Sequence, residues 1–188
     1  MSPEKQQVFL SLNYNVSLLT IVLGIFLLIW IISLVYFSKR KKECEKFSSI
    51  FKYSLPIGFF VSLVASLITL YYSDILGVLP CGLCWFQRVS LYAMVLIFGL
   101  AWLRNDKNIF PYVLVLSIFG EIISLYHHYL QMGYSELLPC PVVASTIDCA
   151  KPTFIEFGFI TFPFMAVILF IFFILLASFA HNCSKKTK

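Results

Sequence analysis

The chain has 188 residues, of which 60% are hydrophobic and 12% are charged, and its mean hydropathy is +0.90. A water-soluble domain of this length cannot bury so much apolar surface, so most of the chain is expected to lie in lipid. The formal net charge is +5, but the basic residues cluster beside apolar runs, which indicates membrane topology rather than nucleic-acid binding. The sequence has no Gly-rich phosphate loop, dinucleotide fingerprint or HExxH zinc motif, so soluble nucleotide chemistry is not expected.

Five apolar runs are long enough to cross the hydrocarbon core of a bilayer, which takes about 20 residues of helix. Lipid offers no hydrogen-bond partner to bare backbone, and the runs are too long for barrel strands, so we predict that all five are α-helices. The predicted fold class is therefore an all-α integral membrane protein. The predicted spans are Val16–Phe37, Tyr53–Tyr72, Trp85–Leu103, Ile109–Leu130 and Gly158–Ala180.

The distribution of positive charge predicts the orientation of these spans. No basic segment precedes the first span and its apolar run is too long for a cleavable signal peptide, so we expect it to be retained. When the spans alternate, eleven of the fourteen Lys and Arg residues fall on one side, which the positive-inside rule makes cytoplasmic. The N-terminus is then outside and the C-terminus inside. The eleven are Lys39, Arg40, Lys41, Lys42, Lys46, Lys52, Arg104, Lys107, Lys185, Lys186 and Lys188.

This orientation divides the six cysteines into two groups. Cys44 and Cys183 fall in cytoplasmic segments, where disulfides are rare, and are expected to be free thiols without an essential role. The other four fall in the two outer loops, where disulfides persist. These four are Cys81, Cys84, Cys140 and Cys149.

The first pair, Cys81 and Cys84, has the CxxC spacing that places two sulfurs about one helical turn apart, directly before an apolar span. Pro80 and Gly82 are expected to keep this segment from forming regular helix and to give the sulfurs room for disulfide geometry. Cys84 would lie at a helix N-terminus, which favours a thiolate. Arg88, four residues on, shares its face and either supports this thiolate and a polar acceptor or simply reaches the lipid headgroups.

The second pair, Cys140 and Cys149, lies in the longest outer loop, between Gln131 and Phe157. Its spacing suits a loop disulfide that another protein can approach. The same spacing also fits a disulfide that only stabilises the loop. The four outer cysteines could also form a tetrahedral zinc site. That interpretation is less favoured, because the first pair adjoins a lipid-embedded helix rather than a small soluble domain.

Two runs of residues identify a family. The run from Cys81 to Arg88, CGLCWFQR, resembles the signature of the DsbB family of disulfide bond formation proteins, and of its BdbC-like branch in particular. The run from Phe157 to Phe164, FGFITFPF, is similar to the opening of that branch's last helix. The resemblance covers about residues 53–180 and implies a four-helix transmembrane bundle. Residues 1–52 would add an N-terminal transmembrane helix and a basic cytoplasmic linker, and residues 181–188 a basic cytoplasmic tail.

The resemblance also implies an activity. Members of the family reoxidise a DsbA-like, thioredoxin-fold thiol oxidase and pass the electrons to a membrane quinone, so the protein would be a quinone-dependent protein-disulfide oxidoreductase. By position, Cys140 and Cys149 would form the disulfide that the partner attacks, with Cys140 making the mixed disulfide. Electrons would then reach the pair Cys81 and Cys84. The implied location is the bacterial cytoplasmic (inner) membrane, with the active cysteines on its extracytoplasmic face.

The resemblance further implies a quinone site beside the first pair, without deciding between ubiquinone and menaquinone. Cys84 would face the quinone next to Arg88, and Trp85 adjoins Cys84. His127 matches the position of a histidine that lines the family's quinone site, although an ordinary interfacial histidine is an equal alternative. No CxxCH haem motif is present, so a lipid-soluble quinone is the economical acceptor of two electrons.

Two ionisable residues of the fourth span lie seven positions apart, Glu121 and His128, and therefore share a helical face. Because ionisable groups within a membrane are functional candidates, we consider a polar path for protons between them. The alternative is a protonated glutamate that is hydrogen-bonded to a neighbouring helix.

Three other functions remain open at this stage. An enzyme of the vitamin K epoxide reductase type also couples CxxC to quinones, but there the spaced pair precedes CxxC, whereas here CxxC comes first. A non-enzymatic membrane scaffold with disulfide-stapled loops and a metal-binding transporter or sensor are the others. Consumption of quinone in the presence of a reduced thioredoxin-fold partner would separate these classes.

Overall fold

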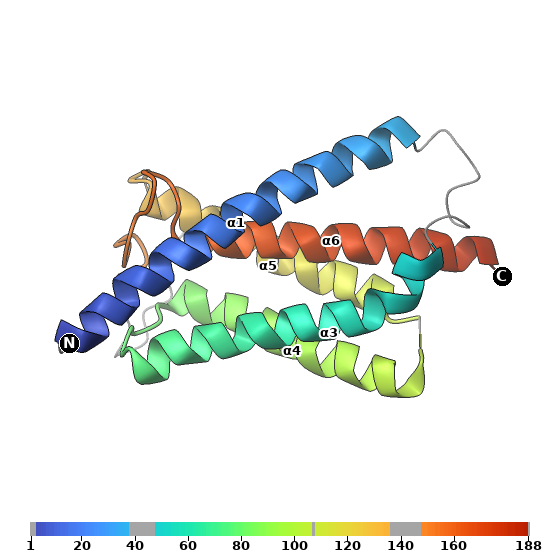
Figure 1. The fold of residues 1–188 in the computed structure, drawn as a ribbon, viewed down its shortest axis with the longest axis horizontal. Coiled ribbons are helices and arrows are strands. Elements are labelled where there is room, and N and C mark those ends of the chain that lie inside the picture. Colours follow the sequence, from blue (N-terminus) through green and yellow to red (C-terminus); the bar gives the residue numbers. More distant parts are fainter. Residues whose placement is uncertain (1–2, 38–47, 107, 136–147, 188) are drawn as a thin grey trace.

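The structure is a computed structural model, and it describes residues 3–37, 48–106, 108–135 and 148–187. The predicted all-helical architecture is confirmed, since the only strand-like pairing in these ranges is an isolated bridge between Glu156 and Ile160. The elements lie lengthwise beside one another (Figure 1). They are α1 (Pro3–Phe37), α3 (Ser48–Leu70), the π-helical turn η1 (Tyr71–Ile75), α4 (Gly82–Arg104), α5 (Phe110–Gln131) and α6 (Phe162–Thr187).

The described part of the chain contains five helices long and apolar enough to cross a membrane. Large hydrophobic side chains are exposed along these helices rather than hidden: Leu96 is 68% exposed, Val115 70% and Ile122 62%. Contiguous apolar surface of this extent is unfavourable in water and suits contact with lipid chains. The protein is therefore a multi-pass membrane protein, as the sequence predicted.

Several helix boundaries differ from the predicted spans; α3 begins at Ser48 rather than Tyr53, and α6 ends at Thr187 rather than Ala180. α1 begins at Pro3, well before Val16, because a polar first segment can continue a helix beyond the apolar run that crosses the membrane. α6 begins at Phe162 rather than Gly158, since a tight turn precedes it. Phe157 and Gly158 have φ values of 52° and 80° in that turn, which the backbone bridge from Glu156 closes.

The bundle is held by aromatic packing between α4, α5 and α6. Phe98 on α4 and Phe173 on α6 are fully buried, with ring centroids 5.9 Å apart. Phe170 on α6 approaches the backbone of α5 at Gly120, where a Cβ atom would lie only 2.4 Å from the ring. α3 packs on α4, and α1 lies obliquely across α6 (Figure 1). The core therefore belongs to the helical bundle, with α1 added on one side.

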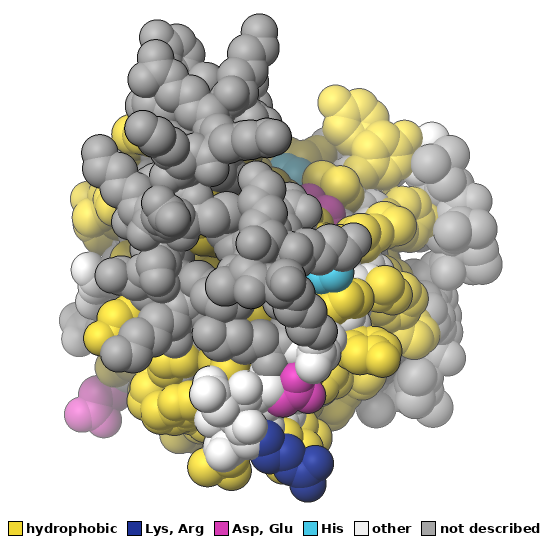
Figure 2. Space-filling view, turned by 90° about the vertical axis from the view of Figure 1, so that its right-hand side faces the viewer, with side chains coloured by type: hydrophobic (Ala, Val, Ile, Leu, Met, Phe, Trp, Pro, Cys, Tyr) yellow, Lys and Arg dark blue, Asp and Glu magenta, His cyan; other side chains and the backbone are white. Residues whose placement is uncertain are grey.

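The chain reverses direction from each helix to the next, which sorts the loops to two ends. The N-terminus of α1, the segment before α4 and the segment before α6 share one end, which we call the cysteine end because Cys81 and Cys149 lie there (Figure 1). The connection between α4 and α5 and the end of α6 lie at the other. Seen from that opposite end, hydrophobic side chains form most of the described surface, and a basic group lies at its lower edge (Figure 2).

Candidate redox site

The first cysteine pair forms the N-terminus of α4. Cys81 is the N-cap residue, with extended backbone (φ −77°, ψ 173°), and its sulfur accepts a hydrogen bond from the backbone N–H of Cys84 at 3.3 Å. The two sulfurs are 2.9 Å apart and both thiols are free. The prediction that Gly82 lies in irregular backbone is wrong, because α4 begins there. The extended N-cap at Cys81 brings its sulfur back over the first turn, which suffices to pair it with Cys84.

The hydrogen bonds of this turn converge on Cys81 rather than on Cys84. Cys81 is 5% exposed, and its sulfur lies 3.5 Å from Nε2 of His127 on α5. The hydrogen bond from the Cys84 thiol, helped by His127 and opposed by burial, lowers the pKa of Cys81 to about 4. The contacts from Cys84 and His127 thus favour a thiolate at Cys81, whereas the helix N-terminus led the sequence analysis to expect one at Cys84.

His127 is held between two glutamines. Its Nδ1 atom lies 3.4 Å from Nε2 of Gln87 on α4, and its Nε2 atom lies 3.2 Å from Nε2 of Gln131, one turn further along α5. The ring is fully buried. Oε1 of Gln131 is buried with no hydrogen-bond partner among the described residues, and a half-turn of that amide would let it accept from the ring N–H. The glutamines thus fix the ring that faces Cys81.

Arg88 is anchored across the helix pair by three contacts. Its guanidinium donates to the carbonyl of Thr69 at 3.0 Å and to the hydroxyl of Ser73 at 3.4 Å, and it lies 5.6 Å from the ring centroid of Trp85. The two acceptors flank the start of η1, where backbone bonding shifts to the wider π pattern. Such turns are frequent at functional sites. Arg88 therefore has a defined position, unlike a side chain that only extends toward lipid headgroups.

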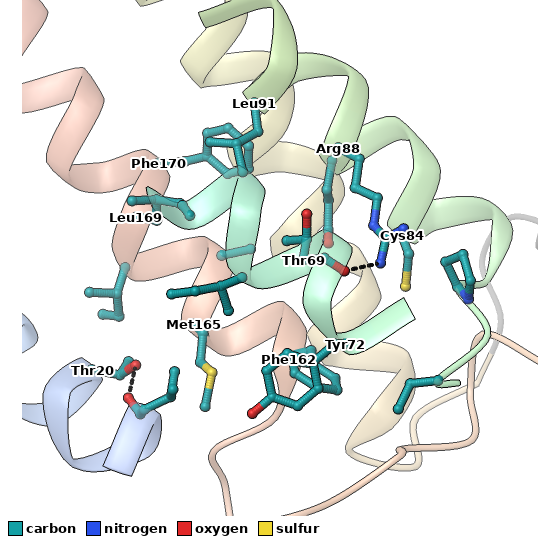
Figure 3. Close-up of a pocket in the computed structure, with 18 of the residues that line it drawn as sticks. Thr20, Thr69, Tyr72, Cys84, Arg88, Leu91, Phe162, Met165, Leu169 and Phe170 are labelled. Carbon is teal, nitrogen blue, oxygen red and sulfur yellow. Dashed lines mark hydrogen bonds between the residues drawn. The ribbon is translucent and has the colours of Figure 1, made fainter. Parts of the chain in front are cut away.

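A cavity of about 230 Å³ opens beside Cys84. Cys84 and Arg88 form one side of it, and apolar side chains of α6, including Phe162 and Met165, form another (Figure 3). The sequence predicted a cofactor site built from Arg88, Cys84, His127 and Trp85. Cys84 and Arg88 line this cavity, while Trp85, half exposed, and His127, buried beside Cys81, are absent from its lining.

The lining suits a quinone head group. A quinone ring is apolar on both faces and carries carbonyl acceptors at its edge. The cavity offers mostly apolar walls, the guanidinium of Arg88, the Cys84 sulfur and a few polar side chains, among them Gln87 and Thr69. Arg88 could donate to a carbonyl oxygen, and Cys84 lies on the same side of the cavity (Figure 3). The residues present therefore fit the cofactor that the sequence implied.

Cys149, the described member of the second cysteine pair, lies close to the first pair in the loop before α6. Cys149 is disulfide-bonded and 1% exposed, and it belongs to the same buried cluster as Cys81, Leu83 and Leu130. Cys140 lies outside the described residues. Within the loop disulfide that the sequence predicted to be open to another protein, Cys149 packs against the N-terminus of α4. A thiol formed at this position would lie close to the first pair.

Three ligand atoms of this site could also hold a metal ion. The sulfurs of Cys81 and Cys84 and a ring nitrogen of His127 all lie within 4.8 Å of one another. This group differs from the four-cysteine zinc site that the sequence raised, and it supplies three ligands where structural zinc takes four.

The proposed path between Glu121 and His128 is not formed by direct contact. Nδ1 of His128 lies 3.1 Å from the hydroxyl of Thr161, and its ring packs on Phe164 with centroids 5.2 Å apart. Oε2 of Glu121 is buried without a hydrogen-bond partner in the described ranges, and no hydrogen bond there joins the two residues.

Sequence reasoning missed Gln87, Gln131, Thr69 and Ser73 as parts of the site. Gln87 stands inside the recognised run and Gln131 lies one turn after His127, so spacing could have flagged both. Thr69 and Ser73 carry no such signal, because their role depends on how α3 lies beside α4.

Comparison with known proteins identifies the family of this chain. The family model for disulfide bond formation protein DsbB matches residues 51–180. Disulfide bond formation protein C of Bacillus subtilis (strain 168) is 42% identical over 117 residues, which cover 61% of this chain and 83% of that protein. The SPbeta prophage-derived disulfide bond formation protein B of the same organism is 38% identical over 112 residues, which cover 60% and 74%.

A probable disulfide formation protein of Coxiella burnetii (strain CbuK_Q154) is 34% identical over 132 residues, which cover 68% of this chain and 89% of that protein. No solved structure gives a significant match. The family match covers α4 and α5 and most of α3 and α6, and it leaves out α1. With Cys81, Cys84 and Cys149 at one end of a membrane-spanning bundle, this chain belongs to the DsbB family of disulfide bond formation proteins.

Proposed function

We propose that this protein is a quinone-dependent protein-disulfide oxidoreductase that reoxidises a DsbA-like, thioredoxin-fold thiol oxidase. The observation that carries the proposal is the different placement of the two sulfurs of one pair. Cys81 is buried on the side of Cys149, whereas Cys84 lines an apolar cavity beside Arg88. Electrons from the loop pair can therefore enter at one sulfur and leave from the other.

The first half of the reaction is thiol–disulfide exchange. A thiolate of the reduced partner attacks Cys140 in a disulfide with Cys149, so a mixed disulfide forms while Cys149 leaves as a thiolate and is protonated. The partner's second thiol then attacks the mixed disulfide, which releases oxidised partner and leaves Cys140 and Cys149 as a dithiol. This dithiol reduces the disulfide between Cys81 and Cys84 by the same two exchanges.

The second half returns the first pair to its disulfide. In the dithiol, Cys81 carries the negative charge under the hydrogen bonds from Cys84 and His127, and Cys84 holds a proton on its sulfur at the cavity. Arg88 would bind a carbonyl oxygen of the quinone. A bound quinone supplies a sink for two electrons and two protons and leaves as quinol, so the net reaction oxidises one partner dithiol per quinone.

We place the cysteine end on the extracytoplasmic face of a bacterial cytoplasmic (inner) membrane, with the N-terminus outside and the C-terminus in the cytoplasm. The distribution of Lys and Arg supports this orientation. Residues 53–180 would be the catalytic bundle, residues 1–52 an added helix and linker, and residues 181–188 a cytoplasmic tail.

The decisive experiment uses the purified full-length protein in lipid nanodiscs with a reduced thioredoxin-fold dithiol protein and a decyl-tailed benzoquinone. Quinone absorbance and partner thiols are followed together, and one quinone should disappear for every two thiols lost. Cys84→Ser should abolish both signals, whereas Cys44→Ser should leave them unchanged. A wild-type protein that consumes no quinone would overturn the proposal and favour a non-enzymatic membrane scaffold with disulfide-stapled loops.

A further inference from the structure

α1 forms a wall of the cavity although it lies outside the family match. The cavity is lined on one side by Val16, Leu19, Thr20 and Leu23 of α1, while the family model matches residues 51–180 only. In the close-up, Thr20 faces the cavity from α1 and Cys84 lies on the other side of it (Figure 3). The site therefore includes a helix that the family core does not supply.

α1 is fixed in place at the cysteine end by specific contacts. The hydroxyl of Tyr72 donates to Oδ1 of Asn13 at 2.8 Å, and both side chains are buried. The ring of Phe9 packs edge-on against those of Tyr72 and Phe154, with centroids 6.0 and 6.3 Å away. The ammonium group of Lys5 donates to the carbonyl of Ile75 at 2.9 Å. A buried hydrogen bond between helices is costly to break in lipid, so this half of α1 has a defined register.

The surface that α1 presents to the cavity is apolar. The hydroxyl of Thr20 donates to the carbonyl of Val16 at 2.8 Å, so its hydrogen-bonding capacity is used within α1 itself. The remaining contributors from α1 are aliphatic. The wall opposite the guanidinium of Arg88 thus suits the apolar face of a ring or the first units of an alkyl tail.

The size of the cavity limits what it can enclose. Its volume of about 230 Å³ is below the roughly 300–1,000 Å³ of pockets that enclose drug-sized ligands. A ring head group fits this space, whereas a long isoprenoid tail must extend beyond it. The α1 side chains therefore lie where ring substituents and the start of the tail would pass.

We infer that α1 is part of the quinone site, and that its residues at positions 16, 19 and 23 set the bulk of the ring substituents and proximal tail that the site accepts. This inference rests on the proposed function. It assigns to the added helix a role in ligand selection beyond anchoring.

The test compares two identical substitutions on the same helix. Val16→Trp fills the cavity wall, whereas Val22→Trp changes a valine that is 57% exposed and outside the lining. Binding of a decyl-tailed benzoquinone is measured as thermal stabilisation of the oxidised protein, without turnover. Val16→Trp should weaken binding about 10-fold or more, because added bulk in a fitted site is poorly tolerated. Val22→Trp should bind like the wild type.

A second readout maps the contact directly. An azido-benzoquinone with a short alkyl tail should cross-link to the α1 peptide that contains residues 16–23. Val16→Ala should shift the binding preference toward quinones with larger ring substituents, opposite to Val16→Trp, and a mere folding defect would not produce that reversal.

The outcomes distinguish failure of the proposed function from failure of the role assigned to α1. If the wild type neither binds nor reduces quinone, the proposed function fails. If the wild type does both, but the two tryptophan variants bind equally well and cross-links fall only on α3, α4 and α6, the function stands and the role of α1 is refuted.

Discussion

Nε2 of His127 on α5 lies 3.5 Å from the sulfur of Cys81 at the start of α4, and this contact joins two helices at the redox pair. The same ring contacts Gln87 and Gln131 through its two nitrogens. The arrangement supports negative charge on Cys81 while Cys84 faces the cavity. The two sulfurs of one CxxC pair therefore have different roles, Cys81 in carrying charge and Cys84 in facing the cavity, and this difference can be measured.

The titration of Cys81 should depend mainly on the thiol of Cys84. The pKa of Cys81 is lowered to about 4, so in the reduced wild type this sulfur stays a thiolate from neutral pH down to that value and protonates below it. Cys84→Ala removes the largest cause, and the pKa of Cys81 should rise toward the ordinary thiol value of about 8.5. At neutral pH the variant should then be largely protonated at Cys81.

The measurement is the ultraviolet absorbance of the thiolate as a function of pH, taken as the difference from the same protein with Cys81→Ser. Cys84→Ser keeps a hydroxyl donor and should shift the titration less than Cys84→Ala. Equal titrations in all three proteins would contradict the role assigned to Cys84.

His127 should help to lower the pKa of Cys81, whereas the neighbouring His128 should not. His127→Ala removes a hydrogen bond to Cys81, so the pKa of Cys81 should rise, but by less than in Cys84→Ala. His128→Ala is the matched control, since that ring contacts Thr161 instead. Gln87→Ala should reproduce part of the His127 effect by releasing the ring. If His128→Ala shifted the pKa of Cys81 as much as His127→Ala, the role assigned to the contact between Cys81 and His127 would be wrong.

Arg88 should be required for quinone affinity in a way that charge alone cannot replace. Its guanidinium contacts Thr69, Ser73 and the ring of Trp85 together, which the ammonium of a lysine cannot do. Both Arg88→Gln and Arg88→Lys should weaken binding of a decyl-tailed benzoquinone, by about 10-fold or more for the glutamine variant. Arg104→Gln, at the opposite end of α4, should bind normally. Wild-type affinity in Arg88→Lys would show that a positive charge is sufficient.

The close packing of α5 on α6 should make Gly120 intolerant of substitution. A Cβ atom there would lie 2.4 Å from the ring of Phe170, which itself lines the cavity. Gly120→Ala should lower the free energy of unfolding by about 1–3 kcal/mol, because the ring cannot move without repacking. Thermal unfolding in detergent micelles measures this loss.

Gly24→Ala serves as the control, since its Cβ would lie at an ordinary 3.6 Å from Ile168. Alanine is the better helix former by about 1 kcal/mol, so this variant should be at least as stable as the wild type. Equal destabilisation by both substitutions would show that the contact with Phe170 does not cause the loss of stability in Gly120→Ala.

The sequence by itself determined the membrane class, the number of spans and the shared face of Cys84 and Arg88. Transfer of an apolar run into lipid depends on that run alone, and a separation of four residues places two side chains on one face of any α-helix. The cysteine motif and the residues after it also identified the family, which the match over residues 51–180 confirms.

Only the tertiary structure decided which sulfur contacts His127, which groups hold His127 and Arg88, and that α1 lines the cavity. Each of these depends on contacts between residues far apart in the chain, such as Cys81 with His127, Arg88 with Thr69 and Asn13 with Tyr72. Helix spacing fixes the directions of side chains on one helix. The rotation and depth of the neighbouring helix, which select the partner, are set by packing across the whole bundle.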